Sequence, residues 1–129
     1  SECPGMLIRD CVVRGGWSGA GLSRCPDSVI ENNVFAMTIL RHVTCDSAAL
    51  VRNNIFCECI RNKAHQTLVE LGAGVRESNN CFHVRWPEDE KLAINWRPLT
   101  EYRVRTGSNA FAANPMMPGS PPNASIQRP

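Results

Sequence analysis

The chain has 129 residues, of which 43% are hydrophobic and 20% charged, so it is long enough for about one ordinary globular domain. Its net charge of +2 is too small for a nucleic-acid-binding protein, which would carry a strongly basic face. No apolar run approaches the roughly 18 residues needed to span a membrane. No signal peptide is visible and the chain begins without methionine, so we expect a trimmed, mature or partial form.

The cysteines show no metal-binding or disulfide pattern. Their spacing contains no Cys-x-x-Cys pair, and an odd number of cysteines cannot form a closed set of disulfides. Because cysteine is small and packs well in apolar interiors, we expect mostly buried thiols, with one or two disulfides as the alternative. The seven cysteines stand at positions 3, 11, 25, 45, 57, 59 and 81.

The first 27 residues are typical of short strands separated by turns. Residues 7–13 form an apolar run, which predicts one short strand. Four glycines between positions 15 and 21 surround Trp17 and predict a turn-rich insertion. We expect a second short strand at residues 22–25, ended by Pro26-Asp27.

A short motif then recurs. Val-Ile-Glu-Asn-Asn-Val-Phe at 29–35 returns as Leu-Val-Arg-Asn-Asn-Ile-Phe at 50–56 and, one residue longer, as Val-Arg-Glu-Ser-Asn-Asn-Cys-Phe at 75–82. The second asparagines of these pairs lie 21 and 26 residues apart. Residues 7–13 form a fainter copy, with Asp10 lying 23 residues before Asn33. Recurrence at roughly 20–50 residues is typical of solenoids, propellers and arrays.

Each repeat has room for three short strands. In the first clear repeat we expect strands at 28–31, 34–37 and 38–43, a tight corner at Asn32-Asn33, a turn at 44–47, and a new repeat starting at 48–51. This length cannot easily hold the paired helices of tetratricopeptide or ankyrin units, whose periods are about 33–34 residues. The leucines that a leucine-rich repeat requires are absent. The sequence therefore predicts an all-β fold, a parallel β-helix of about four coils.

Stacking of the coils predicts which side chains form columns. Equivalent residues of successive coils should lie at about 4.8 Å, the spacing between paired strands. We expect an inward aromatic column of Phe35, Phe56 and Phe82, and an aliphatic column of Ile30 and Val51 beside it. Asn33, Asn54 and Asn80 should form a buried asparagine ladder. Glu31, Arg52 and Arg76 should form an outward charge ladder.

The pattern changes after the third repeat. Residues 57–74 predict a longer coil with a return strand at 67–71, and Pro98-Leu99 can begin a short helix. We therefore expect coils over 1–84, a loop excursion with a short helix over 85–114 that returns to the coil, and a Pro-rich tail or further coil over 115–129.

The Ile-x-Asn-Asn-x-Phe pattern resembles the coils of right-handed parallel β-helix proteins, the pectate-lyase-like superfold. Residues 99–110 and 113–117 are similar to a segment of bacterial members, in which a helix with an aromatic residue leads into Thr-Gly-x-Asp and then Asp-Pro-x-Phe. Asn109, Asn114 and Met117 stand where Asp, Asp and Phe are usual. The resemblance covers most of residues 6–122 and implies a right-handed β-helix. Since family members usually have many more coils, we expect a segment of a longer β-helix.

The resemblance supplies no catalytic site. Lyases of this superfold usually use a Lys or Arg base, often with calcium, and its hydrolases use paired carboxylates. The chain carries no such motif, so the catalytic residues stay unknown, and we expect no metal or cofactor. Asp27 and Asp46 could lie on adjacent coils and hold a hard cation. An aspartate before serine is more often a turn former.

One further metal hypothesis concerns Cys57 and His83, which each lie three residues after a ladder asparagine. They should stack side by side facing outward, and with Cys59 they could bind a soft metal. A fourth ligand is not evident. His42 and His65 have no evident partners.

Three tryptophans, Trp17, Trp86 and Trp96, fall in expected loops rather than columns. Exposed aromatic rings beside a β-helix often stack on sugar rings, although capping loops also need large residues. We expect a segment of a secreted, periplasmic or cell-surface protein that binds polysaccharide through these residues and, by lyase or glycoside hydrolase chemistry, could cleave it. The alternative is a non-catalytic sensor or scaffold module of a multidomain surface protein. A third hypothesis is a small solenoid that self-associates through its open coil ends.

Overall fold

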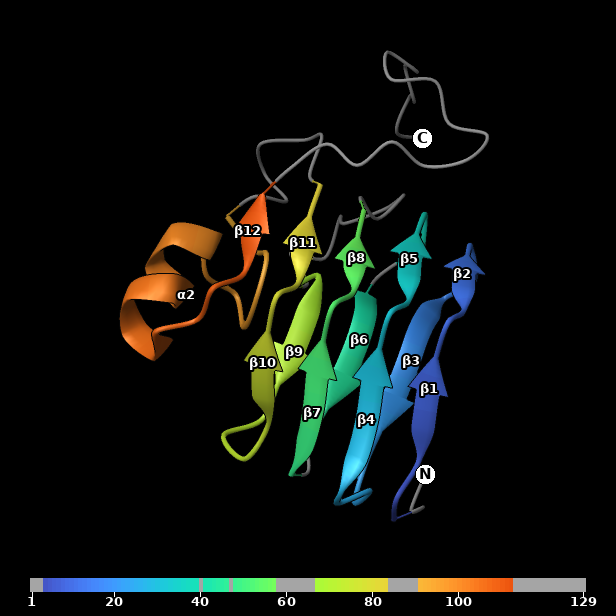
Figure 1. The fold of residues 1–129 in the computed structure, drawn as a ribbon. Coiled ribbons are helices and arrows are strands. Elements are labelled where there is room, and N and C mark those ends of the chain that lie inside the picture. The colour runs from blue at the N-terminus through green and yellow to red at the C-terminus, as the bar shows by residue number, and fades with distance from the viewer. Residues whose placement is uncertain (1–3, 40, 47, 58–66, 84–90, 113–129) are drawn as a thin grey trace.

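The computed structural model describes residues 4–39, 41–46, 48–57, 67–83 and 91–112. Within these ranges the strands form three sheets, and all the strand pairs are parallel. The first three passes visit the sheets in the same order and each adds one strand to every sheet, whereas the last described part of the chain adds strands to the first two sheets (Figure 1). The expectation of an all-β fold of parallel strands is confirmed.

The first sheet holds the strands that precede the asparagine corners. Its order is β1-β4-β7-β10, with β1 at Leu7–Arg9, β4 at Ser28–Glu31, β7 at Ala49–Arg52 and β10 at Arg76–Ser78. The register pairs Ile8 with Ile30 and Ile30 with Val51. Because Ile30 and Val51 are both fully buried, the expected aliphatic column is confirmed.

The second sheet holds the strands that leave the corners. Its order is β12-β11-β8-β5-β2, with β2 at Val12–Arg14, β5 at Val34–Ala36, β8 at Ile55–Phe56, β11 at Cys81–Phe82 and β12 at Phe111–Ala112. The pairing of β12 with β11 shows that the chain returns to this sheet after residue 98. The expected boundaries at 84 and 114 lie outside the described residues and stay predictions.

The third sheet differs most from the sequence prediction. It contains β3 at Ser18–Leu22, β6 at Arg41–Cys45 and β9 at Val69–Leu71, in the order β3-β6-β9. The glycine-rich segment expected as an insertion therefore forms strand β3, and the strand expected at 22–25 is wrong. The turn expected at 44–47 is also wrong in part, because Thr44 and Cys45 belong to β6. The bounds of β3 and β6 follow from their pairing, which no local sequence pattern reveals. Leu22 and Cys45, for example, are in register and both buried.

The corners between the first two sheets use left-handed backbone. Asn32, Asn53 and Asn79 have φ values of 56°, 55° and 53°, a region that asparagine tolerates better than most residues. Asp10 takes the same conformation at φ 57° and divides residues 7–13 into β1 and β2, rather than the one strand expected. The register also aligns Asp10 with Asn32, so the expected alignment with Asn33 is wrong.

The second asparagine of each pair forms the expected ladder. The Asn33 amide nitrogen donates to Asn54 Oδ1 at 3.1 Å, and the Asn54 amide nitrogen donates to Asn80 Oδ1 at 3.0 Å. Each amide also donates to a backbone carbonyl of the preceding coil, as Asn54 does to Ile30 at 3.1 Å. These bonds satisfy buried polar groups that would otherwise destabilise the fold.

The aromatic column is confirmed as well. The ring centroids of Phe35 and Phe56 lie 5.5 Å apart and those of Phe56 and Phe82 lie 5.0 Å apart, within the range favoured by aromatic pairs. His42 extends this column, with its ring 5.9 Å from Phe56. Each fully buried Phe side chain stabilises the fold by roughly 1.5–3 kcal/mol.

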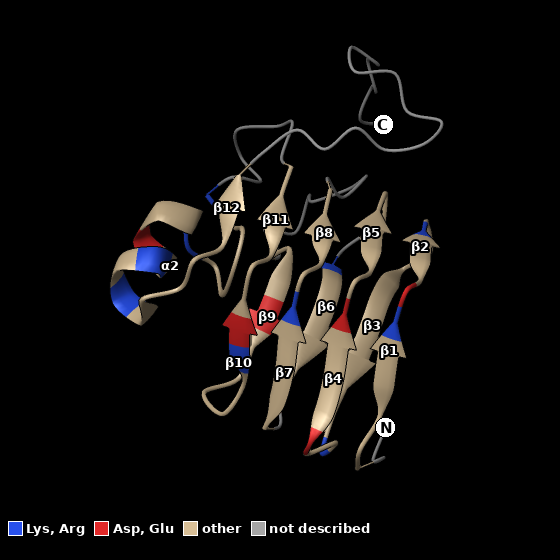
Figure 2. Cartoon of the chain, in the orientation of Figure 1, with Lys and Arg blue, Asp and Glu red and all other residues tan. Residues whose placement is uncertain are grey.

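The outward charge ladder is only partly as expected. Arg52 pairs with Glu31 at 3.1 Å, and Figure 2 shows these charges on the neighbouring strands β7 and β4. Ser78, rather than Arg76, occupies the next position of this row, because Arg76 is in register with Leu50. The shift places Glu77 beside Val51, in the inward column. A one-residue shift of register moves side chains to the opposite face of a strand.

Helix α2, Leu99–Thr106, lies against the last coil (Figure 1). Its residues Leu99 and Tyr102 are buried in the apolar core, and Gly107 ends it with φ 72° and an N–H bond to Arg103. Glycine is suited to this left-handed position because it lacks a Cβ. The helix expected at Pro98-Leu99 is confirmed. In the described part of the chain, no helix is long and apolar enough to cross a membrane.

The described cysteines carry thiols. Cys11 is exposed, whereas Cys25, Cys45, Cys57 and Cys81 are buried. Cys3 and Cys59 lie outside the described residues. Mostly buried thiols were the favoured expectation, and the described cysteines agree with it.

Candidate functional site

An unusual surface residue is Trp96, which follows the third sheet in a tight turn. Ile94 and Arg97 exchange backbone bonds of 3.3 and 2.9 Å, and the intervening Asn95 and Trp96 have φ values of 50° and 59°. Positive φ at both central residues defines a type I′ turn. Asparagine accepts this conformation readily, but a bulky residue rarely does. Trp96 therefore occupies a strained backbone position. Its side chain is 46% exposed, so burial of the ring does not compensate fully for this strain.

The other members of this site come from β6 and β9. The Arg41 guanidinium lies over the Trp96 ring at 5.4 Å from its centroid and makes a 2.7 Å ion pair with Glu70. Arg41 also donates to the Thr44 hydroxyl at 3.3 Å. The side chain of Asn95 fixes the turn to β9, because it accepts from the Leu71 N–H at 2.7 Å and donates to the Leu71 carbonyl at 3.0 Å. We call Arg41, Thr44, Glu70 and Trp96 the Trp96 platform.

The three predicted binding tryptophans are not gathered at one point. Trp17 is 65% exposed and directly precedes β3, where Ser18 is in register with Arg41. Trp17 therefore lies at the start of the third sheet, whereas Trp96 follows the coil beyond β9 and is level with the end of that sheet. Three strand spacings, about 14 Å, separate their coils. Trp86 lies outside the described residues.

Sequence reasoning identified Trp96 but missed Arg41, Thr44 and Glu70. The third sheet carries no repeated residue that would reveal its register, so nothing indicated that positions 41, 70 and 96 meet. The sequence Ile94-Asn95-Trp96-Arg97 resembles no common type I′ turn, which would place glycine after asparagine.

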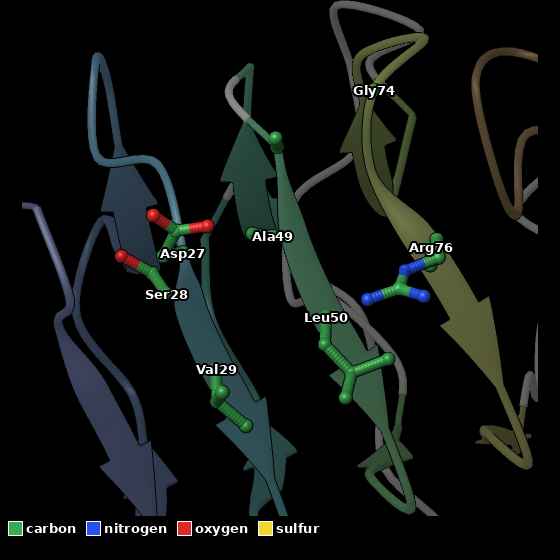
Figure 3. Close-up of a pocket in the computed structure, with 8 residues that line it drawn as sticks. Asp27, Ser28, Val29, Ala49, Leu50, Gly74 and Arg76 are labelled. Carbon is green, nitrogen blue, oxygen red and sulfur yellow. The ribbon is translucent and has the colours of Figure 1, made fainter.

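The two aspartates that could hold a hard cation both lie in or beside turns. Asp46 accepts a 3.0 Å bond from the Arg24 N–H and a 3.2 Å bond from the Ser23 hydroxyl, which link two successive coils. Asp27 is exposed at φ 60° and lines a shallow groove of about 270 Å³ whose opposite side is Arg76 (Figure 3). In the described ranges, no three metal-binding side chains lie together.

The predicted Cys57 and His83 pair is half correct. The register of β8 and β11 places them on adjacent coils, but Cys57 is 3% exposed and therefore does not face outward as expected. Cys59 and His65 lie outside the described residues. Burial of Cys57 follows from its position after the inward Phe56, where the strand has ended and alternation no longer applies.

His42 proves to be a core residue with two partners. Its Nδ1 lies 3.0 Å from the Thr38 hydroxyl, and its Nε2 contacts the Cys57 carbonyl oxygen. Nε2 therefore donates to the carbonyl, and Nδ1 accepts from the hydroxyl. Burial lowers the pKa of His42 to about 4, although the bond to Cys57 opposes the shift. The ring is neutral near pH 7 and takes no part in the surface site.

No family model, curated protein or solved structure matches this chain.

Proposed function

We propose that the protein is a right-handed parallel β-helix of the pectate-lyase-like kind, which binds a polysaccharide on the outer side of its β3-β6-β9 sheet. The fold part is supported by the repeated order of the three parallel sheets and by the asparagine ladder. In Figure 1 the chain runs up through β1 and β2, back down through β3, and forward to β4 at the next level, which favours a right-handed path.

The Trp96 platform is the observation that carries the binding proposal. A left-handed conformation costs a non-glycine residue about 1–2 kcal/mol, and such strain is typical of functional sites. Here it holds a large ring at the surface in a fixed orientation, with Arg41 against it. Selection for folding alone would favour glycine at this position.

The chemistry around Trp96 suits a sugar. The apolar face of a pyranose ring packs on an indole, while its hydroxyl groups require donors and acceptors at the edge of the ring. Arg41 and Glu70 provide both beside Trp96. Trp17, at the start of the third sheet, would contact a more distant unit of a long chain. This spacing favours a polymer over a monosaccharide.

We propose binding alone, without a catalytic step. A non-catalytic sensor or scaffold module would use the same platform. We propose a secreted, periplasmic or cell-surface location because extended polysaccharides are found there. The core thiols are compatible with an oxidising compartment, since burial shields Cys25, Cys45, Cys57 and Cys81 from exchange.

Affinity electrophoresis through gels containing acidic or neutral polysaccharides tests the proposal. We expect at least one polysaccharide to retard the wild-type protein and Trp96→Gly to lose at least tenfold in affinity. Glycine relieves the strained turn, so this variant should stay folded, as far-UV circular dichroism would show. Val104→Ala is the matched control, because Val104 is 86% exposed on α2 and outside the platform. Equal retardation of wild type and Trp96→Gly, or no retardation by any polysaccharide, would contradict the proposal.

A further inference from the structure

A second candidate binding site lies at the end of the coil stack, where a cavity of about 690 Å³ opens between β10 and helix α2. This volume is within the range of about 300–1,000 Å³ that is usual for small-molecule sites. The segment from Leu71 to Glu77 forms one wall, and Tyr102, Thr106 and Ser108 contribute to the other. None of the members of the Trp96 platform lines this cavity.

Glu77 is the residue that makes the cavity distinctive. The register places it in the column of Ile8, Ile30 and Val51, so an inward aliphatic position is occupied by a carboxylate. A carboxylate that is partly removed from water is unfavourable unless it is paired or hydrogen-bonded. An aliphatic residue would complete the column more simply. Glu77 is half-buried, and its two hydrogen bonds compensate its charge only in part.

The hydrogen bonds of Glu77 leave acceptor capacity facing the cavity. Its Oε2 accepts from the Asn80 amide at 2.8 Å, and its Oε1 accepts from the Ser108 hydroxyl. A carboxylate offers about four lone-pair sites, so about two are unused by these bonds. The Thr106 hydroxyl donates its own hydrogen to the Tyr102 carbonyl at 2.8 Å. The wall therefore has spare acceptors, while the hydroxyl donors of Ser108 and Thr106 are engaged within the protein.

No basic side chain neutralises Glu77 among the residues that the structure describes. Arg76 also borders the cavity, but its guanidinium points across the outer face towards Leu50 and the neighbouring groove (Figure 3). Figure 2 shows the acidic part of β10 next to α2. The negative charge also acts on Tyr102, whose pKa is raised first by burial and then by Glu77, so its phenol stays protonated.

We propose that this cavity binds a small organic cation through a primary ammonium group that donates to Glu77. An ammonium group has three N–H donors and one positive charge, which match the spare acceptors and the uncompensated carboxylate. The remaining volume accommodates a body the size of one sugar ring, whose hydroxyls meet Tyr102 and Asn95. Amino sugars combine these features.

NMR titration of the isotopically labelled protein with glucosamine tests this proposal, at a pH where the amine is protonated. We expect saturable shifts of the Gly107 and Ser108 amides. N-acetylglucosamine, which lacks the charge, should bind at least tenfold more weakly. Glu77→Gln is the matched variant, because its amide oxygen can still accept from Asn80 while its amide nitrogen donates to the Ser108 hydroxyl oxygen. It should fold normally and bind glucosamine at least tenfold more weakly than wild type.

Three results would overturn the proposal: no saturable shift with glucosamine, equal binding of N-acetylglucosamine, or unchanged affinity in Glu77→Gln. Any of them would leave Glu77 only as the terminating acceptor of the asparagine ladder. Trp96→Gly should bind glucosamine as wild type does, because Trp96 does not line the cavity. The proposal therefore stands or falls independently of polysaccharide binding on the platform.

Discussion

Replacement of Asn54 by alanine should strongly destabilise the protein, because Asn54 is the middle member of the asparagine ladder. Its Oδ1 accepts from the Asn33 backbone N–H and from the Asn33 amide, both at 3.1 Å. Its own amide donates to the Ile30 carbonyl at 3.1 Å and to Asn80 Oδ1 at 3.0 Å. Alanine removes all four bonds.

The loss can be estimated from the groups that Asn54→Ala would leave behind. Asn80 Oδ1 keeps its bond from the backbone N–H of residue 54, and the Asn33 amide keeps its bond to Ile8. The Asn33 N–H and the Ile30 carbonyl lose their bonds to Asn54. A buried donor without a partner costs about 1–3 kcal/mol and a further lost hydrogen bond about 0.5–1.5 kcal/mol, so the Asn33 N–H and the Ile30 carbonyl together predict a loss of about 1.5–4.5 kcal/mol.

Urea denaturation followed by far-UV circular dichroism measures this loss. The control is Asn53→Gly, since Asn53 is exposed with φ 55°, a conformation that glycine adopts without strain. We expect the control to lose less than about 1 kcal/mol. If Asn54→Ala lost no more stability than Asn53→Gly, the ladder would not hold the coils together, and the reasoning would be refuted.

Two further predictions concern His42 and Gly19. The pKa of His42 falls from 6.5 in the unfolded chain to about 4 in the fold. The stability that the neutral ring contributes is therefore complete above pH 6.5 and is lost as the pH falls towards 4. The free energy of unfolding should fall by roughly 3 kcal/mol over this range. NMR titration should find its ring neutral at about pH 5, and titration near the ordinary value would contradict its burial. Gly19→Ala would place a Cβ 2.6 Å from Phe35 Cδ1 and against the His42 carbonyl, at a cost of about 1–3 kcal/mol in thermal unfolding. Gly21→Ala, with no atom within 4 Å of the added Cβ, is the control on the same strand, and an equal loss in both variants would disprove the close contact.

The first two sheets could be predicted well because their residues repeat for a physical reason. Strand β4 runs from Ser28 to Glu31 as expected, and the asparagine and phenylalanine columns follow from stacking identical residues. A buried amide has few other ways to satisfy its hydrogen bonds, so the Asn-Asn pair marks the register strongly.

Register errors arose where the motif was weak. In the first coil Asp10-Cys11 replaces the asparagine pair, so the sequence pattern aligns Asp10 with Asn33, whereas the structure aligns it with Asn32. In the third clear repeat the additional residue, Val75, lies before strand β10. Counting back from the first asparagine of each pair would have placed Glu77 level with Ile30 and Val51. The signal for the unusual carboxylate was therefore present in the sequence.

The third sheet and the Trp96 platform could not be predicted in the same way. β3 consists largely of small residues, and β6 and β9 share no motif with it, so sequence alone left their register open. The Gly19 position is explained only by the close approach of His42 and Phe35. Contacts such as Arg41 with Trp96 depend on a loop returning beside the sheet, and no local pattern encodes that distance.

NMR titration of the tryptophan indole N–H signals with a polysaccharide fragment tests the central claim most directly. The chain has three such signals, from Trp17, Trp86 and Trp96, and single substitutions by phenylalanine would assign them. Our account predicts a saturable shift of the Trp96 signal, with no change in the Val104 amide on α2. Binding that leaves the Trp96 signal unmoved would contradict it.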